Sequence, residues 1–357
     1  MSQAIRYARY GGPEVLTLDD VPIPDPGPGQ VRVAVRAAGV NGIDWKLRYG
    51  FMDRGQLSAG PAGVGVEFAG TVDAVGAGAG AGIGSGTGMG ASFGTRAGTS
   101  AGTTAGTSGG TTAGTGGGSA AGTGAGDGGW SVGQAVFGKV VSGAAATHVT
   151  VDARDLLAMP AWLSFEQAAA LPVAVETAWR TLRQLDVKEG HTLLVHAVAG
   201  GVGLVAAQLA RARGVRVVGT ASPARHDFLR ELGVRPVEYG DGGDGLAGRV
   251  RAAAPEGVDA VLDASGRDVL AMSVELAGGP DRVVTIADGR AAEYGVRFST
   301  GADGVSPAEV FAEVLPLLER GALRVPIERT FPLGRTADAH RLSEEGHLLG
   351  KIVVTVP

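Results

Sequence analysis

The clearest absence in this 357-residue sequence is cysteine, which does not occur. The chain can therefore form no disulfide, offers no thiolate nucleophile and cannot hold zinc through cysteine ligands. Basic residues are not in excess: 31 Lys and Arg stand against 36 Asp and Glu, so the charge pattern that marks nucleic-acid binding is missing. No apolar run reaches membrane-spanning length, and residues 1–6 lack the apolar core of a signal peptide. We expect a cytoplasmic protein with no nucleic-acid or membrane partner.

Residues 79–129 contain little besides Gly, Ala, Ser and Thr. Such a segment buries too little apolar surface to offset the entropy lost on ordering it, so we predict a disordered surface insertion. It has neither the three-residue period of collagen nor a fixed longer repeat. A long insertion of this kind costs little stability when it leaves from a surface turn.

A glycine turn between two apolar runs is the most informative feature that is present. Residues 192–195 are apolar, residues 204–213 have helical spacing, and residues 215–219 form a second apolar run. Strand, glycine turn, helix and strand open a dinucleotide-binding fold, in which N–H groups at the helix start face a pyrophosphate. Val198 replaces one of the three usual glycines, so an ordinary strand–helix joint is the alternative. The residues expected at the pyrophosphate are Gly200, Gly201, Val202 and Gly203.

The end of the second apolar run indicates which dinucleotide binds. An NAD-binding site usually has Asp or Glu there to hold the ribose 2′-hydroxyl, but the first carboxylate here is Asp227. Thr220, Ser222 and Arg225 stand in its place, and a guanidinium suits a 2′-phosphate. We therefore favour NADP(H), with Arg225 as a solvated helix-start charge the alternative.

The rest of the pattern predicts an α/β protein. Strands are expected in a β-rich first part and in an alternating second part, at residues 15–18, 30–37, 67–75, 260–263, 282–287 and 351–356. Helices are expected at residues 164–185, 307–320 and 337–344. Ser164 is a good N-cap for the first of these helices.

Several segments resemble, in family order, the quinone oxidoreductase-like (zeta-crystallin-like) enzymes, the zinc-independent branch of the medium-chain dehydrogenase/reductase superfamily. Besides the glycine turn they are Tyr10–Leu16, Ala38–Asp44, Ala168–Pro172, Asp263–Gly266 and Leu349–Val353. The resemblance covers nearly the whole chain except the insertion.

The resemblance implies a doubly wound parallel Rossmann sheet together with a GroES-like β-barrel domain. Residues 1–158 would form the barrel domain, 159–300 the Rossmann domain, and 301–357 would return to the barrel. The ends of the insertion would lie close together, because the family has a short turn there. Gly65-Val66-Glu67 lacks the histidine of the Gly-His-Glu motif in the zinc branch, so we expect neither catalytic nor structural zinc.

The resemblance also implies which residues contact the cofactor. Asn41 would face the cofactor and substrate, although Asn41-Gly42 is also a turn-forming pair. Thr177 would reach the nicotinamide, Tyr239 the adenosine, and Lys351 the phosphates, with a plain surface lysine the alternative for Lys351. Two further cofactor contacts are expected at Ser265 and Ile286.

Hydride transfer needs no protein nucleophile, because the cofactor carries the chemistry. The acceptor's proton would come from Tyr49, Lys46 or water; Tyr49 and Asn41 are the catalytic candidates. Tyr49 could also wall the substrate pocket with Trp45 and Phe51, although aromatics at this spacing more often lie in a core. We expect His196 to serve in strand-end packing.

These features predict an NADPH-dependent reductase of quinones or α,β-unsaturated carbonyls such as enones and enals, working as a homodimer. One alternative is an enoyl reductase acting on carrier-bound substrates. Another is a dinucleotide-binding protein with little turnover, and a third makes the glycine-rich segment the functional part.

Overall fold

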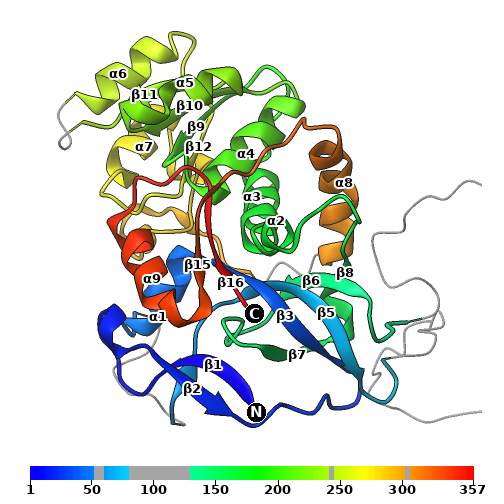
Figure 1. Cartoon of the computed structure of the whole chain (residues 1–357). Coiled ribbons are helices and arrows are strands. Elements are labelled where there is room, and N and C mark those ends of the chain that lie inside the picture. Colours follow the sequence, from blue (N-terminus) through cyan, green and yellow to red (C-terminus); the bar gives the residue numbers. More distant parts are fainter. Residues whose placement is uncertain (52–59, 80–128, 241–244, 302–305) are drawn as a thin grey trace, which may run out of the picture.

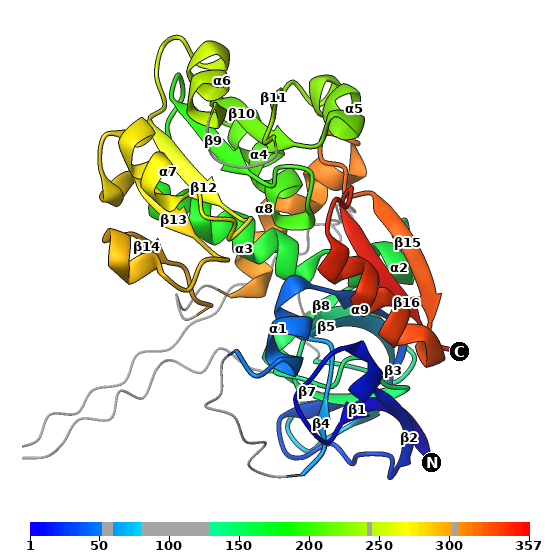
Figure 2. The same cartoon turned by 90° about the vertical axis from the view of Figure 1, so that its left-hand side faces the viewer.

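The structure is a computed structural model that describes residues 1–51, 60–79, 129–240, 245–301 and 306–357. Its elements form two lobes, one above the other in Figure 1. Figure 2 shows that both chain ends lie in the lower lobe. The predicted insertion lies outside the described residues, apart from Ala79 and Gly129.

The upper lobe is a parallel sheet of six strands in the order β11-β10-β9-β12-β13-β14. The strands are β9 (Thr192–His196), β10 (Arg216–Ala221), β11 (Arg235–Glu238), β12 (Ala260–Asp263), β13 (Val283–Thr285) and β14 (Arg297–Phe298). The helices around the sheet are α3 (Pro172–Leu185), α4 (Gly201–Ala212), α5 (His226–Glu231), α6 (Leu246–Ala253), α7 (Leu270–Ala277) and α8 (Pro307–Glu319).

Both faces of this sheet are covered, as a parallel sheet requires. Side chains alternate along β9: Leu193 and Val195 belong to the core cluster that includes α3 and α4. Leu194, between them, belongs to the cluster on the other face, with α6 and α7. The predicted doubly wound α/β fold is confirmed.

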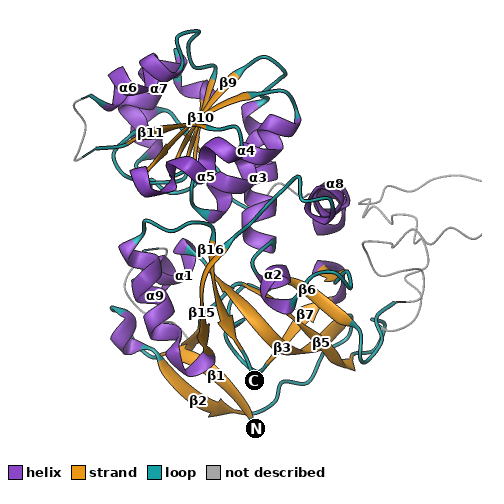
Figure 3. Cartoon of the chain, turned by 45° about the horizontal axis from the view of Figure 1, so that its top comes forward, coloured by secondary structure: helices purple, strands orange, loops and turns teal. Residues whose placement is uncertain are grey.

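The lower lobe is a curved, largely antiparallel sheet in the order β15-β16-β3-β5-β6-β8, with β7 paired to β3 (Figure 3). Its strands are β3 (Gln30–Val40), β5 (Glu67–Val75), β6 (Ala135–Lys139), β7 (His148–Asp152), β8 (Leu156–Ala158), β15 (Ile327–Pro332) and β16 (Lys351–Thr355). A small sheet beside it contains β1 (Ser2–Tyr7), β2 (Thr17–Val21) and β4 (Ala62–Gly63). The helices of the lower lobe are α1 (Gly42–Arg48), α2 (Phe165–Ala169) and α9 (Thr336–Glu345).

The single helix predicted over 164–185 is wrong, because the structure has α2 and α3 in its place. Ser164 is the N-cap, and its Oγ accepts a hydrogen bond from the Gln167 N–H at 3.2 Å. Pro172 then begins α3, since proline has no N–H to continue α2 but fits the first turn of a new helix.

Other boundaries also differ from prediction: the strand expected at 30–37 continues to Val40, and the one expected at 282–287 covers only Val283–Thr285. The strand expected at 15–18 begins at Thr17, because Pro13 starts a 3-10 turn over residues 13–15. Ala79 is not part of an insertion: it is buried in the lower core, and its carbonyl accepts a hydrogen bond from the Trp130 N–H at 3.2 Å. Ala79 and Trp130, which flank the glycine-rich segment, therefore lie side by side, as expected for its two ends.

Among the helices that the structure describes, none has the length and apolar character needed to span a bilayer.

Candidate active site

The two lobes meet where the C-terminal tail crosses the glycine turn. Gly200 and Gly350 form a parallel bridge, and the Gly350 N–H donates to the Ala199 carbonyl at 2.8 Å. Gly350 has a φ of +82°, and an added Cβ would lie 2.1 Å from the Pro326 carbonyl oxygen. Only glycine fits here, so the tail is held directly against the turn that opens α4.

The glycine turn has the geometry of a phosphate cradle. A Cβ on Gly203 would lie 2.5 Å from the Ala197 carbonyl oxygen, so the first turn of α4 packs closely against β9. The N-cap is Gly200, which has no side chain to satisfy the first N–H groups of the helix. Those N–H groups and the helix dipole suit an anion. The residues present therefore fit a dinucleotide pyrophosphate.

A buried polar cluster lies beside the turn. Lys351 Nζ donates to Glu67 Oε1 at 2.6 Å and also to Asn41 Oδ1. Asn41 Nδ2 donates to the same Glu67 oxygen at 2.8 Å, and the Val173 N–H donates to Glu67 Oε2 at 2.7 Å. The Lys351 stem packs on the turn, since a Cβ on Gly201 would lie 2.6 Å from Lys351 Cδ. With Lys351 only 4% exposed, the surface-lysine alternative is wrong.

Asp44 fixes the start of α1, on which the Asn41 side chain depends. Its Oδ2 accepts a hydrogen bond from the Asn41 N–H at 2.8 Å, while its Oδ1 is buried without a partner. Burial raises the pKa of Asp44 to about 7, and the nearby charge of Glu67 acts in the same direction. Asp44 thus orients backbone, and Asn41 turns its amide to Glu67 and Lys351.

The residues expected at the adenosine end lie under the same tail. Arg225 Nη2 donates to both Glu328 oxygens, at 3.1 and 3.2 Å, and to the His347 carbonyl at 3.1 Å. The Tyr239 hydroxyl lies 2.6 Å from His347 Nδ1. Arg225 is therefore not a freely solvated charge: it already carries a carboxylate partner.

Thr220 and Ser222 differ in exposure. Thr220 is buried, and its hydroxyl accepts the Ala197 N–H at 3.2 Å and lies 3.3 Å from His196 Nδ1. Ser222 is half-buried at the end of β10. His196 is buried, and burial lowers its pKa to about 4, so it packs as a neutral ring at the strand end, as expected.

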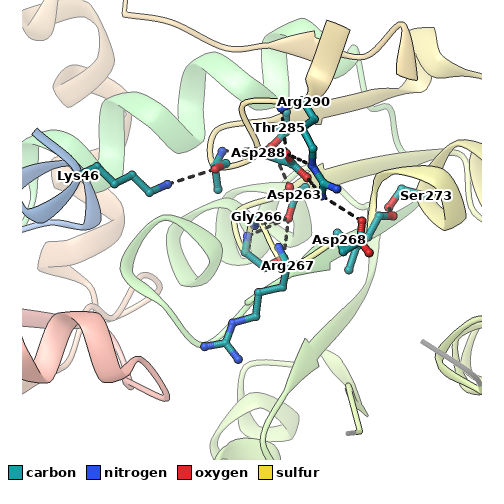
Figure 4. Close-up of polar contacts among 12 residues, drawn as sticks. Lys46, Asp263, Gly266, Arg267, Asp268, Ser273, Thr285, Asp288 and Arg290 are labelled. Carbon is teal, nitrogen blue, oxygen red and sulfur yellow. Dashed lines mark hydrogen bonds and ion pairs between the residues drawn. The ribbon is translucent and has the colours of Figure 1, made fainter. Parts of the chain in front are cut away.

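The carboxyl ends of β12 and β13 form a polar shelf (Figure 4). Asp263 Oδ1 accepts hydrogen bonds from the N–H groups of Ser265 and Gly266, at 2.8 and 3.1 Å, and its Oδ2 accepts the Thr285 hydroxyl at 2.8 Å. Ile286 is half-buried directly after β13. Lys46 reaches this shelf from α1 and donates to the Ala287 carbonyl at 3.2 Å.

Tyr49, the residue that caps α1, and Thr177, in α3, lie in different lobes. The Tyr49 hydroxyl donates to Glu344 Oε2 at 3.4 Å, and its side chain is 42% exposed. Its ring contacts those of Trp45 and Phe51, with centroids 6.2 and 6.1 Å apart. Tyr49 and Phe51 are exposed rather than in a core. Thr177 is half-buried in α3.

Sequence reasoning missed three residues that organise this region: Glu67, Glu328 and Asp263. The sequence showed Glu67 only as the remnant of a zinc motif, although a glutamate that opens an apolar stretch such as the start of β5 signals a buried partner. Glu328 and Arg225 are 103 residues apart, so no local sequence pattern connects them. Asp263 ends a buried strand just before Ser265-Gly266, which is a recognisable turn signal.

No group of three or more His, Cys, Asp and Glu side chains is placed to hold a metal ion in the described part of the chain. The expected absence of zinc stays a prediction.

Two family models match this chain. Residues 27–161 match the family model described as "Alcohol dehydrogenase GroES-like domain", and residues 243–354 match "Zinc-binding dehydrogenase". A quinone oxidoreductase of Pseudomonas aeruginosa is 30% identical, over 95% of this chain and 95% of its own length. The chain belongs to the quinone oxidoreductase-like family of medium-chain dehydrogenases/reductases.

Two other proteins similar to this chain are informative. The pikromycin polyketide synthase component PikAII of Streptomyces venezuelae is 34% identical over 94% of this chain, which spans 8% of that protein's length. A mycobacterial protein solved in complex with NADPH is 28% identical, with a TM-score of 0.76, covering 99% of this chain and 100% of that one.

Proposed function

We propose that the chain is an NADPH-dependent oxidoreductase that reduces a quinone or an α,β-unsaturated carbonyl without zinc. The observation that carries the proposal is the meeting of the glycine turn with the Asn41–Glu67–Lys351 cluster where the two lobes join. When bound, the nicotinamide supplies the hydride. The chain's own residues hold the dinucleotide and shape the acceptor site.

Gly200 to Gly203 and the α4 N-terminus would hold the pyrophosphate. Arg225, Ser222 and Tyr239 would hold the 2′-phosphate end, and Thr177, Ser265 and Ile286 would lie toward the nicotinamide. Asn41 is polarised by Lys351 on its oxygen, so its amide N–H groups become better donors. The mycobacterial relative solved with NADPH supports the choice of cofactor.

The experiment that tests this proposal measures NADPH oxidation with a panel of small quinones, enones and enals, together with dissociation constants for NADPH and NADH. Turnover with at least one acceptor, and tighter binding of NADPH, are expected. Tight NADPH binding with no turnover on any acceptor would instead favour a non-catalytic binding protein. Equal or NADH-favouring constants would contradict the cofactor choice.

A second candidate is an enoyl reductase for carrier-bound substrates. The 34% identity with a polyketide synthase component favours it. Comparing crotonyl pantetheine thioester with a free enone separates the two candidates, since only a carrier-directed site would gain in kcat/KM from the pantetheine arm.

A further inference from the structure

The side chain of Lys46 extends from the lower lobe to a backbone carbonyl of the upper lobe. It lies on α1, yet its Nζ donates to the Ala287 carbonyl, 241 residues along the chain, at 3.2 Å. Ala287 follows β13, at the carboxyl edge of the parallel sheet, where ligands of such sheets bind. Figure 4 shows the side chain extended toward that edge. Lys46 therefore spans the join between the lobes at the carboxyl edge of the parallel sheet.

The groups around Lys46 leave it a cation that can release a proton. Burial lowers the pKa of the Lys46 ammonium, while the negative charges of Asp263 and Asp288 oppose that shift. Both carboxylates are held by other donors: Asp263 by the Thr285 hydroxyl, and Asp288 by Arg290 at 2.9 Å. On its own helix, Lys46 lies 5.7 Å from the centre of the Trp45 ring.

Tyr49, the other side chain considered as a proton source, is placed differently. Its hydroxyl points at Glu344 on α9, and Arg48 lies over its ring at 4.8 Å. A phenol that donates to a carboxylate on α9 is turned toward the lower lobe and not toward the sheet edge of the upper one. Between the two, the geometry favours Lys46.

We propose that Lys46 is the proton donor in the reduction of an α,β-unsaturated carbonyl. This assignment rests on the proposed function. Hydride addition at the β-carbon leaves the electron pair of the C=C bond as an enolate. An N–H bond of Lys46 then breaks and a C–H bond forms at the α-carbon. The neutral amine that remains takes a proton from water, which balances the reaction.

The test compares Lys46→Met and Lys46→Arg with Lys188→Met, a control at a lysine whose side chain is 66% exposed. Arginine keeps the charge and can bond the Ala287 carbonyl, but it does not release its proton. Both Lys46 variants should lower kcat for an enone by about 100-fold or more, the usual contribution of general acid catalysis. NADPH dissociation constants should stay within twofold of wild type, and the control should match wild type throughout.

Two further readouts separate proton donation from a structural role. In wild type, kcat for the enone should fall as pH rises through the lowered pKa of Lys46, and in Lys46→Met this limb should vanish. In the free protein, labelling of lysines with an amine reagent across pH, read by mass spectrometry, should show that the pKa of Lys46 lies below the ordinary value of a lysine side chain.

If Lys46→Arg kept the enone turnover of wild type, the assignment of Lys46 as proton donor would be overturned, because a cation that keeps its proton would be enough for the reaction. The proposed function would still stand. An ordinary lysine pKa for Lys46 in the labelling experiment would also overturn the assignment. No reduction of any acceptor by wild type would overturn the proposed function, and the assignment with it.

Discussion

Removing the Glu67 carboxylate tests the cluster that joins the lobes. Glu67 is fully buried and accepts hydrogen bonds from Lys351, Asn41 and the Val173 N–H. The variant Glu67→Gln keeps the shape but leaves the Lys351 ammonium buried without an anion. Breaking a buried pair from one side costs about 3–5 kcal/mol. At roughly 2 °C per kcal/mol for a chain of this size, Tm should fall by roughly 6–10 °C.

The assay is thermal unfolding followed by circular dichroism at neutral pH, with urea unfolding as a second measure. The matched control is the double variant Glu67→Gln, Lys351→Met, which removes both charges, keeps an amide oxygen as an acceptor at position 67, and should recover most of the loss. A Tm change of less than about 1 °C in Glu67→Gln would refute the reasoning, because it would mean that Lys351 is not held as a buried cation. An equal fall in Tm in the single and double variants would mean that altered packing, and not the unpaired charge of Lys351, causes the loss of stability.

Three further predictions concern single sites or segments. Because burial raises the pKa of Asp44 from 3.8 to about 7, folded Asp44 binds a proton that the unfolded chain has released, so its contribution to stability falls as pH rises through this window. The free energy of unfolding of Asp44→Asn, relative to wild type, should therefore increase from pH 5 to pH 8 in urea titrations; a constant difference would contradict this. Arg225→Ala should weaken NADPH binding by about 1.5–3 kcal/mol with little change for NADH, and Glu328→Gln should strengthen it by freeing Arg225; calorimetry with both cofactors checks each. Replacing residues 81–127 with a few Gly and Ser residues should leave NADPH affinity unchanged and shift Tm by only a few degrees, since Ala79 and Trp130 are already bonded; loss of folded protein would refute it.

Local sequence signals predicted much of the fold. The Ser164 N-cap and the alternation of apolar and polar residues along the first part of β3 depend on neighbours within a few residues, so the sequence alone reveals them. The break between α2 and α3 was missed because apolar spacing continues across it, and only the absent N–H of Pro172 ends the first helix. β1 was missed because only three of its six residues are apolar.

The candidate site was predicted less completely, because its contacts join distant parts of the chain. Lys351 and Glu67 are 284 residues apart, and Arg225 and Glu328 are 103 apart. Asn41 and Lys351 were both expected to contact the cofactor, but no periodicity shows that one carboxylate holds both. The sequence favoured Tyr49 over Lys46 as a catalytic candidate, and only the folded structure shows the Tyr49 hydroxyl at Glu344 and the Lys46 ammonium at the Ala287 carbonyl.

Transfer of deuterium from the nicotinamide to an acceptor tests the central claim most directly. The wild-type chain would be incubated with NADPH labelled with deuterium at C4, in each of the two stereoisomers separately, and with an enone. Mass spectrometry and NMR would then locate the label in the product. We predict deuterium at the β-carbon from one stereoisomer only, because a protein that binds the ring on one face presents one hydrogen. Unlabelled product from both stereoisomers, or bound NADPH that is never consumed with any acceptor, would contradict the account.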